Sequence, residues 1–388
     1  MIWNISRCVS RAPIFTCGSR NDKNSLPVRP MPIAFGHSAE NGRLILIWHC
    51  SNGSIPPVVV PNVANRSRHG IAIRFVSRVI KMSLACGDIR RMKAHRYHTS
   101  HAGWQAMMAW YEQKLARFSV PISSQFVNTR YGCTHIITAG DRCAPPIILL
   151  HGTNVNMLGW QAQIEGLSEQ YYLIAPDVIG YAGKSDPVRL SYRTPDYAFW
   201  LMDVLDALQV SSAVLIGSSA GGFFALHFAY HCPQYVRAVI LLNPCGIVPF
   251  RFPLNIMRQI PIAYTVGFFS RRMASYWLAK KLAQKNVAPN TQPNPENIHL
   301  AYLILKHYIR HHPPGTLQPR QLRQINTPTL LLVSQHEPFL PLRHMLRRAT
   351  RLMPHIQAHI VDGAGHDIHV ERPDFINASI HHFIASLS

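Results

Sequence analysis

The sequence predicts an α/β protein in which helices cover both faces of a mostly parallel central sheet. The main observation is a series of short, continuous apolar runs separated by helical segments, because such runs are typical of strands buried on both faces. A second observation is a pair of alternating segments around a Tyr131-Gly132 turn, which predicts an antiparallel hairpin before the first run. A hairpin that leads into parallel, helix-covered strands is an α/β architecture.

The predicted elements follow in order along the chain. Residues 103–118 are expected to form a packing helix, because apolar side chains recur there at helical spacing: Trp104, Met107, Tyr111, Leu115 and Phe118. The hairpin strands are expected at 125–129 and 133–138. The buried strands are expected at residues 147–150, 172–175, 213–216, 238–242 and 329–333. A last strand at 356–361 precedes a final helix at 373–386.

Between Cys245 and Gln324 the strand rhythm stops, and the chain becomes helical, aromatic and basic. An insertion at this point, before the last two strands, is expected to lie as a helical lid over the strand ends. The polar run at 286–297 predicts an exposed loop within it. Simple packing of the lid onto the core is an equal explanation for any one of its aromatic residues.

Residues 1–95 differ from the rest of the chain in charge and pattern. They hold 14 Lys and Arg against 3 Asp and Glu, about half of the net charge of +21, and they show no sustained period. We expect a poorly ordered basic extension, or upstream sequence from a start codon assigned too early, with Met82 or Met92 as the true start. The folded domain is then residues 100–388. A basic arm that binds nucleic acid or anionic lipid is the alternative, but no nucleic-acid partner is expected.

The cysteines indicate a reducing compartment. The chain has eight, without a C-x-x-C pair or the histidine spacing of a zinc site, so we expect free thiols, no metal and a cytoplasmic location. The longest apolar stretches fall far short of the roughly 20 residues of a membrane-spanning helix, so no transmembrane segment is expected. The first 20 residues, with arginines and serines but no acid, weakly resemble an organellar transit peptide.

The strongest chemical signal is Gly217-Ser218-Ser219-Ala220-Gly221, a G-x-S-x-G sequence between a buried strand and a helix. This context is that of a nucleophile elbow, a sharp strand-to-helix turn that exposes a serine hydroxyl. Glycine suits the turn because a side chain at 217 or 221 would crowd the neighbouring strand or helix. A glycine-rich helix start is the alternative. Ser219 is therefore the candidate nucleophile.

A serine hydroxyl needs a histidine to take its proton and an acid to orient that histidine. His366, in a glycine-containing loop after the last strand, is the candidate base, and His369 is its competitor. Glu337, at the end of the preceding strand, is the candidate acid. Asp362 is its rival, although it precedes the histidine too closely to reach the far ring nitrogen easily.

Two backbone donors for an oxyanion are expected near Ser219. One is the N–H of Ala220, directly after the nucleophile. The other is the N–H of Thr153, in the loop His151-Gly152-Thr153-Asn154 that follows the strand at 147–150. The Asn154 side chain is a further candidate donor.

Together these motifs resemble the α/β-hydrolase fold-1 family over about residues 122–386. The resemblance rests on the elbow, the His151-Gly152 loop, residues 175–177, 180–185 and 328–338, and residues 363–366 with Glu371-Arg372-Pro373. The order Ser219, Glu337, His366 along the chain is also that of the family. The resemblance implies that Asp177 shapes a loop and takes no part in catalysis. It disfavours members with an aspartate nucleophile, such as epoxide hydrolases, because this chain has Ser219.

The resulting prediction is a serine hydrolase that cleaves a small-molecule carboxylic ester through an acyl-enzyme on Ser219, without a metal or cofactor. The resemblance leaves thioesterases, carbon–carbon bond hydrolases, acyltransferases and cofactor-free haloperoxidases open. Outside enzymes, the alternative is an inactive hydrolase scaffold that binds a ligand or partner through its basic, aromatic lid.

Overall fold

The computed structural model describes residues 97–252, 258 and 271–387, together with the backbone of four short upstream strands. These strands form two antiparallel pairs, β1 (Leu44–Leu46) with β4 (Val58–Val60) and β2 (His49–Cys50) with β3 (Gly53–Ser54). Apart from them, the basic extension expected at residues 1–95 lies outside the described residues. The chain divides into two units, Met1–Ile89 and Arg90–Ser388.

The larger unit is built on an eight-stranded sheet with the order β12-β11-β10-β9-β7-β8-β6-β5. Its strands β5 and β6 form an antiparallel hairpin, β6 runs antiparallel to β8, and all the other neighbours are parallel. The strands are β5 (Ile122–Thr129), β6 (Gly132–Ala139), β7 (Pro146–Leu150), β8 (Tyr172–Pro176), β9 (Ala213–Ser218), β10 (Val236–Leu242), β11 (Thr329–Ser334) and β12 (Ile356–Val361). The predicted α/β architecture, its hairpin and its buried strands are thus confirmed.

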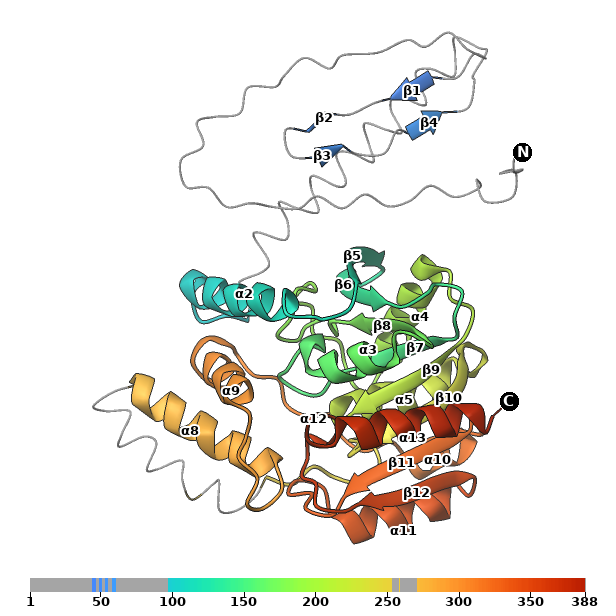
Figure 1. Ribbon diagram of the computed structural model, residues 1–388. Helices are drawn as coiled ribbons and strands as arrows, with labels where there is room; N and C mark the ends of the chain where they lie inside the picture. The colour runs from blue at the N-terminus through green and yellow to red at the C-terminus, as the bar shows by residue number, and fades with distance from the viewer. Residues whose placement is uncertain are drawn as a thin grey trace. The chain divides into compact units, whose positions relative to one another are not determined.

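Helices cover both faces of this sheet (Figure 1). Alternate residues of β7 enter different cores: Ile148 and Leu150 pack on one face, and Ile147 and Leu149 pack on the other. The first core includes residues of α4 (Asp196–Leu208), α5 (Ala220–His231), α10 (Pro319–Gln324) and α11 (Leu342–Leu352). The second includes residues of α2 (His101–Leu115), η1 (Met157–Trp160), α3 (Gln161–Leu167), α12 (Ile368–Glu371) and α13 (Pro373–Ala385). The short helix η2 (Pro233–Tyr235) leads into β10.

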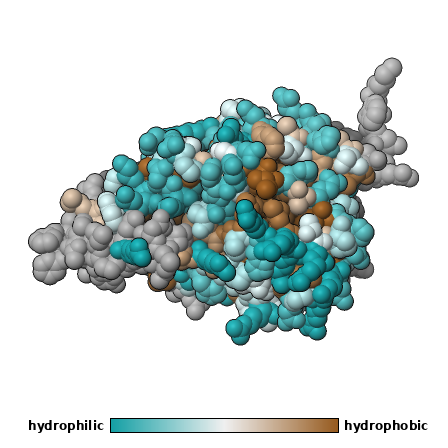
Figure 2. All heavy atoms as spheres, turned by 90° about the horizontal axis from the view of Figure 1, so that it is seen from below, coloured by the Kyte–Doolittle hydropathy of each residue, from teal (hydrophilic) through white to brown (hydrophobic). Residues whose placement is uncertain are grey.

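Two helices illustrate how burial follows the sequence pattern. The helix predicted at 103–118 is α2, which buries Met107 and Tyr111 but ends at Leu115, three residues before Phe118. The amphipathic α11, at the bottom of Figure 1, buries Met345, Ala349 and Leu352 and turns arginines outward. The face seen from below is accordingly mostly hydrophilic, with an apolar strip through its middle (Figure 2).

The segment between β10 and β11 contains the helices α8 (Arg271–Asn286), α9 (Pro295–His307) and α10. Residues 253–257 and 259–270, with several of its aromatic side chains, lie outside the described residues. The α8 helix packs on α9, and α9 packs on α2, where Lys114 and Arg117 form ion pairs with Glu296. The predicted loop is shortened to 287–294, because α8 ends at Asn286 and α9 begins at Pro295, and residues 289–292 and 294 of it are exposed. In the described part of the chain, no helix is both long and apolar enough to cross a membrane.

Candidate active site

Ser219 lies at the sharp turn between β9 and α5. Its backbone angles are φ 53° and ψ −116°, a conformation that non-glycine residues rarely adopt and that is typical of functional sites. Hydrogen bonds to β10 and the residues after it hold the turn: Ser219 N–H donates to the Leu242 carbonyl at 3.0 Å, and the Ser219 carbonyl accepts from Cys245 N–H at 2.8 Å. The serine is 8% exposed. The strained turn therefore holds the hydroxyl in one place with little freedom to relax.

Glycines allow this turn to pack closely. A Cβ atom on Gly217 would lie 2.3 Å from the Gly221 carbonyl oxygen, and one on Gly221 would lie 1.9 Å from the Leu150 carbonyl oxygen. A Cβ on Gly152, in the loop after β7, would lie 3.3 Å from the Ser219 Cβ. These contacts agree with the crowding that the sequence pattern predicted, and they bring the loop after β7 against the serine.

Glu337 and His366 form a direct pair at the carboxyl ends of β11 and β12. The His366 Nδ1 atom lies 2.6 Å from Glu337 Oε2, and both side chains are buried. The other carboxylate oxygen, Oε1, accepts from the N–H groups of Phe339 and Leu340 at 2.8 and 3.2 Å. Since these donors and the histidine orient the carboxylate from both sides, the imidazole is held in one tautomer with Nε2 left for chemistry.

The acid also controls the charge of the histidine. Burial alone would lower the pKa of His366, but the Glu337 charge and hydrogen bond outweigh burial and raise it, with smaller contributions from Asp367 and Glu371. A raised pKa means that the imidazolium formed by proton transfer from a serine is stabilised here. The pair thus has the electrostatics of a general base that works with a carboxylate.

The Ser219 hydroxyl and the His366 ring have different hydrogen-bond partners in this structure. The Ser219 hydroxyl lies 3.9 Å from the Cys245 thiol, whose pKa burial raises to about 12, so the thiol is neutral. Within the described residues, no hydrogen bond joins Ser219 to His366. Such contacts are often long before a substrate is bound, so the gap does not argue against the pair.

The loop after β7 is held rigidly beside Ser219. His151, whose pKa is lowered by burial, accepts from Val178 N–H through Nε2 at 2.9 Å, so its Nδ1 donates to the Gly152 carbonyl at 2.9 Å. Among the described residues, neither the Thr153 N–H nor the Ala220 N–H donates to another protein group, so both are available to an oxyanion. The structure thus brings the predicted donors to one loop and one helix start beside the serine.

The Asn154 side chain, expected from the sequence as a further oxyanion donor, bonds instead to the backbone of His311. Its side-chain amide donates to the His311 carbonyl at 2.9 Å and accepts from the His311 N–H at 2.7 Å. Both polar atoms of the side chain are therefore used to fasten the segment after α9 to the loop after β7.

The rival residues lie in other environments. The Asp362 side chain is exposed, whereas the carboxylate paired with His366 is that of Glu337. His369 is buried against Trp160, with ring centroids 4.5 Å apart, and burial lowers its pKa to about 3. This imidazole is therefore neutral and packed against a tryptophan, without the carboxylate partner that His366 has. Within the described part of the chain, no group of three or more His, Cys, Asp or Glu side chains is arranged to hold a metal ion.

Three positioning residues were not found from the sequence. Asn243, at φ 43°, donates to the His366 carbonyl at 2.8 Å and to Ser334 Oγ at 2.7 Å, which joins the histidine loop to β11. Glu371 accepts from Gly365 N–H and from Ala288 N–H, both at 2.8 Å. Asp367 accepts from the Asn286 side chain at 3.0 Å. The end of α8 is thus tied to the histidine loop.

Gly365 is a residue whose type reflects this contact between the end of α8 and the histidine loop. A Cβ on Gly365 would lie 2.5 Å from the Val287 carbonyl carbon, so glycine is required where α8 approaches. On sequence grounds alone, the glycines of this loop favour His366 over His369. Asn243 bonds to residues 91 and 123 positions away, and Ala288 lies 83 positions from Glu371, so no local sequence pattern predicts these contacts.

Comparisons with known proteins agree with this geometry. A sequence model of the alpha/beta hydrolase fold matches residues 145–373. Two Bacillus subtilis proteins are similar: an uncharacterized carboxylesterase, nap (28% identity over 70% of this chain and 90% of that protein), and the carboxylesterase YbfK (29%, 71% and 92%). The crystal structure of carboxylesterase CesB (YbfK) matches with a TM-score of 0.64 at 26% identity, covering 74% of this chain and 99% of that one. The Bacillus subtilis naproxen esterase matches with a TM-score of 0.62 at 26% identity, over 73% and 98%.

Proposed function

Since the chain belongs to the alpha/beta hydrolase fold family, we propose that it is an esterase that hydrolyses small-molecule carboxylic esters through an acyl-enzyme on Ser219. The observation that carries the proposal is the buried 2.6 Å pair of His366 and Glu337, at the same sheet edge as a strained serine. The similarity to Bacillus subtilis carboxylesterases over about nine-tenths of their length supports the ester as substrate.

The proposed reaction has two halves. His366 Nε2 takes the Ser219 proton while Oγ attacks the ester carbonyl carbon, and Glu337 stabilises the imidazolium through Nδ1–H. The N–H groups of Ala220 and Thr153 donate to the oxyanion of the tetrahedral intermediate. The intermediate expels the alcohol, which takes the proton from His366. A water molecule then attacks the acyl-enzyme by the same route and releases the acid.

We also propose that the segment at 245–324 acts as the lid of this site. The bonds of Ala288 to Glu371 and of Asn286 to Asp367, next to His366, support this role, since they tie α8 to the histidine loop. Aromatic rings gather at the other side of the segment, where His311 stacks on Tyr181 with centroids 5.4 Å apart and Tyr192 contacts Phe224. They favour an ester with an aromatic acyl or alcohol group.

Replacement of the nucleophile tests the proposal. Ser219→Ala should lower hydrolysis of p-nitrophenyl butyrate by at least about 10³-fold in a protein with unchanged circular dichroism, because nucleophile and base act as a unit. Ser211→Ala, which removes an exposed serine before the start of β9, is the matched control and should keep full activity. An active Ser219→Ala enzyme would refute the assignment.

Two further measurements separate the alternatives. An inactive scaffold would not react with a fluorophosphonate at Ser219, and peptide mass spectrometry locates the adduct on that residue. A panel of esters and thioesters of different acyl length, with and without an added alcohol, distinguishes esterase from thioesterase and hydrolysis from acyl transfer. We propose a cytoplasmic site of action, which is supported by the described cysteines Cys133, Cys143, Cys232 and Cys245, none of which forms a disulfide.

A further inference from the structure

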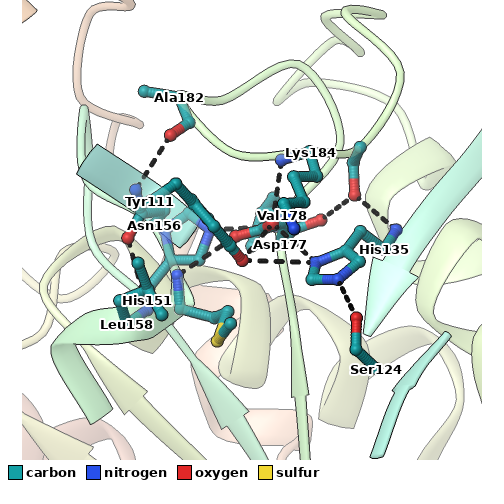
Figure 3. A network of polar contacts seen from close by, with 12 residues as sticks. Tyr111, Ser124, His135, His151, Asn156, Leu158, Asp177, Val178, Ala182 and Lys184 are labelled. Atoms are coloured by element: carbon teal, nitrogen blue, oxygen red, sulfur yellow. Dashed lines mark hydrogen bonds and ion pairs between the residues drawn. The ribbon is translucent and has the colours of Figure 1, made fainter. Parts of the chain in front are cut away.

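A second serine, histidine and carboxylate, which do not include Ser219, lie in a row on β5, on β6 and directly after β8 (Figure 3). Ser124 lies on β5, which is the edge strand of the sheet, and its side chain is exposed. His135, on the neighbouring strand β6, and Asp177, directly after β8, are completely buried. The row therefore runs from the interior of the protein to its surface.

Hydrogen bonds join all three side chains. Ser124 Oγ lies 2.9 Å from His135 Nε2, and His135 Nδ1 lies 3.0 Å from Asp177 Oδ2. The Tyr111 hydroxyl, from α2, donates to the same Asp177 oxygen at 2.8 Å. At the outer array the serine is thus already bonded to its histidine, a contact that is missing between Ser219 and His366.

The positions of the protons follow from the number of donors. Burial alone would raise the pKa of Asp177, but the hydrogen bonds from the His135 side chain and from Lys184 N–H help to lower it to about 2, so the carboxylate is ionised and only accepts. Tyr111 uses its single proton on Asp177. The proton between His135 Nδ1 and Asp177 must then belong to the histidine. In the neutral imidazole Nε2 carries no proton and accepts from Ser124 Oγ–H.

The backbone keeps this row in register. His135 N–H donates to Ser185 Oγ at 2.9 Å, and Ser185 Oγ donates to the Asp177 carbonyl at 2.6 Å. Asp177 N–H donates to the His135 carbonyl at 2.9 Å. The Asp177 carboxylate also accepts from Met157 N–H and Lys184 N–H, at 3.2 and 2.8 Å. Supporting bonds of this kind fix the geometry that proton transfer needs.

We propose that Ser124 is a second activated serine of this protein, which accepts acyl or phosphonyl groups from small, activated electrophiles. His135 Nε2 takes the Oγ proton while Oγ forms a bond to the carbonyl carbon or phosphorus. The bond to the leaving group breaks, and that group departs with the proton. With a fluorophosphonate the P–F bond breaks and the products are phosphonylated Ser124 and hydrogen fluoride.

The surroundings of Ser124 favour a single modification over turnover. Ser124 lies in a regular, exposed strand, where solvent competes with fixed dipoles for a developing oxyanion. We therefore expect reaction at Ser124 to be much slower than at Ser219 and the adduct to persist. The chemistry does not depend on the function proposed for Ser219, because no residue is shared between the two arrays.

Ser123 provides an internal control, since it is the adjacent exposed serine on the same strand and has no hydrogen bond to a histidine in the described structure. The Ser219→Ala full-length protein is incubated with a fluorophosphonate, and fragmentation of the peptide at 118–130 measures the occupancy of each serine. We expect at least tenfold more adduct on Ser124 than on Ser123, because a positioned general base contributes typically about 10²- to 10⁴-fold. Equal occupancy, or no adduct on Ser124, overturns the proposal.

A denatured sample and a base variant identify the cause of any preference. In 8 M urea the row is lost, so the ratio of Ser124 to Ser123 adduct should fall to about one. His135→Gln in the Ser219→Ala background should lower the ratio in the same way, and near-ultraviolet circular dichroism checks its fold. A preference that persists in urea or in the folded variant would assign the reactivity to local sequence and refute the role of His135. If the variant does not fold, the native and urea samples decide the question.

Discussion

The two serine sites differ in what surrounds the same three kinds of side chain. At Ser124 the hydrogen bonds from serine to carboxylate are complete, but the serine lies in an ordinary exposed strand. At Ser219 the bond from serine to histidine is open, but the serine is strained, nearly buried and flanked by backbone donors. The comparison teaches that a hydrogen-bonded row supplies a base, whereas turnover also needs a fixed nucleophile and a preorganised oxyanion site.

The carboxylates also differ in their dependence on the fold. Asp177 accepts hydrogen bonds from Tyr111, His135 and two backbone N–H groups, so it joins α2, β6 and the segments that begin at Met157 and Lys184. Among the described residues, the partners of Glu337 are His366 and the N–H groups of its own loop. Removal of Asp177 should therefore act mainly on stability, and removal of Glu337 mainly on catalysis.

Asp177 is expected to act on stability and Glu337 on catalysis. The largest effect that tests this difference is the loss of activity expected in Glu337→Gln. The amide cannot stabilise the imidazolium of His366 and favours the wrong tautomer, so kcat for p-nitrophenyl butyrate should fall by about 10³- to 10⁴-fold. The midpoint of urea unfolding should move little. Steady-state kinetics gives kcat and urea titration gives the unfolding midpoint, both measured on the same preparation.

Asp362→Asn is the matched control for the acid. Its side chain is exposed, so the variant should keep kcat within about twofold. If Asp362→Asn lost more activity than Glu337→Gln, the role of acid would pass to Asp362.

The second effect is expected for Asp177→Asn. The amide turns an NH2 group toward one of the donors and weakens a buried, charged hydrogen-bond network, which should lower the free energy of unfolding by about 3 kcal/mol. Because the pKa of Asp177 is about 2 in the folded protein, this difference should be present above about pH 4 and vanish as the pH falls through about 2. Urea unfolding at several pH values measures it.

Asp203→Asn is the control for this stability effect. Asp203 forms an ion pair with Arg130 near the surface, with N and O 2.7 Å apart, and such exposed pairs contribute up to about 1 kcal/mol. If Asp177→Asn lowered the free energy of unfolding no more than Asp203→Asn does, the buried network would contribute little to stability.

Much of the fold could be predicted because its signals are local. The buried strand at 213–216 and the turn glycines of the elbow were read from neighbouring residues, and β9 and α5 lie where these predict. The hairpin was correctly placed from alternation and Gly132, which has φ 135°. Helix ends were less accurate at α2, because apolar Phe118 continues the pattern after the helix has stopped at Leu115.

The sites were only partly predictable because they depend on contacts between distant residues. The sequence order and loops were enough to name Ser219, Glu337 and His366 as candidates. Asp177 was set aside as a residue that shapes a loop, and it does hold one through Lys184 N–H, but its bonds to Tyr111 and His135 span 66 and 42 residues. No periodicity or motif connects an exposed Ser124 to these partners.

The smallest expected effect is a shift in the pH dependence of ester hydrolysis, which tests how Glu337 controls the charge of His366. His366 must be neutral to take the Ser219 proton, and because its pKa is raised, half-maximal kcat should lie above the ordinary histidine value of about pH 6.5. Below that point kcat should fall about tenfold per pH unit. In Glu337→Gln the charge that raises the pKa is gone while burial remains, so the midpoint of the residual activity should move to lower pH, whereas Asp362→Asn should keep it. Profiles of kcat between pH 5 and 9 measure these midpoints. A wild-type midpoint at or below 6.5, or one unmoved in Glu337→Gln, would mean that Glu337 does not set the charge of the base.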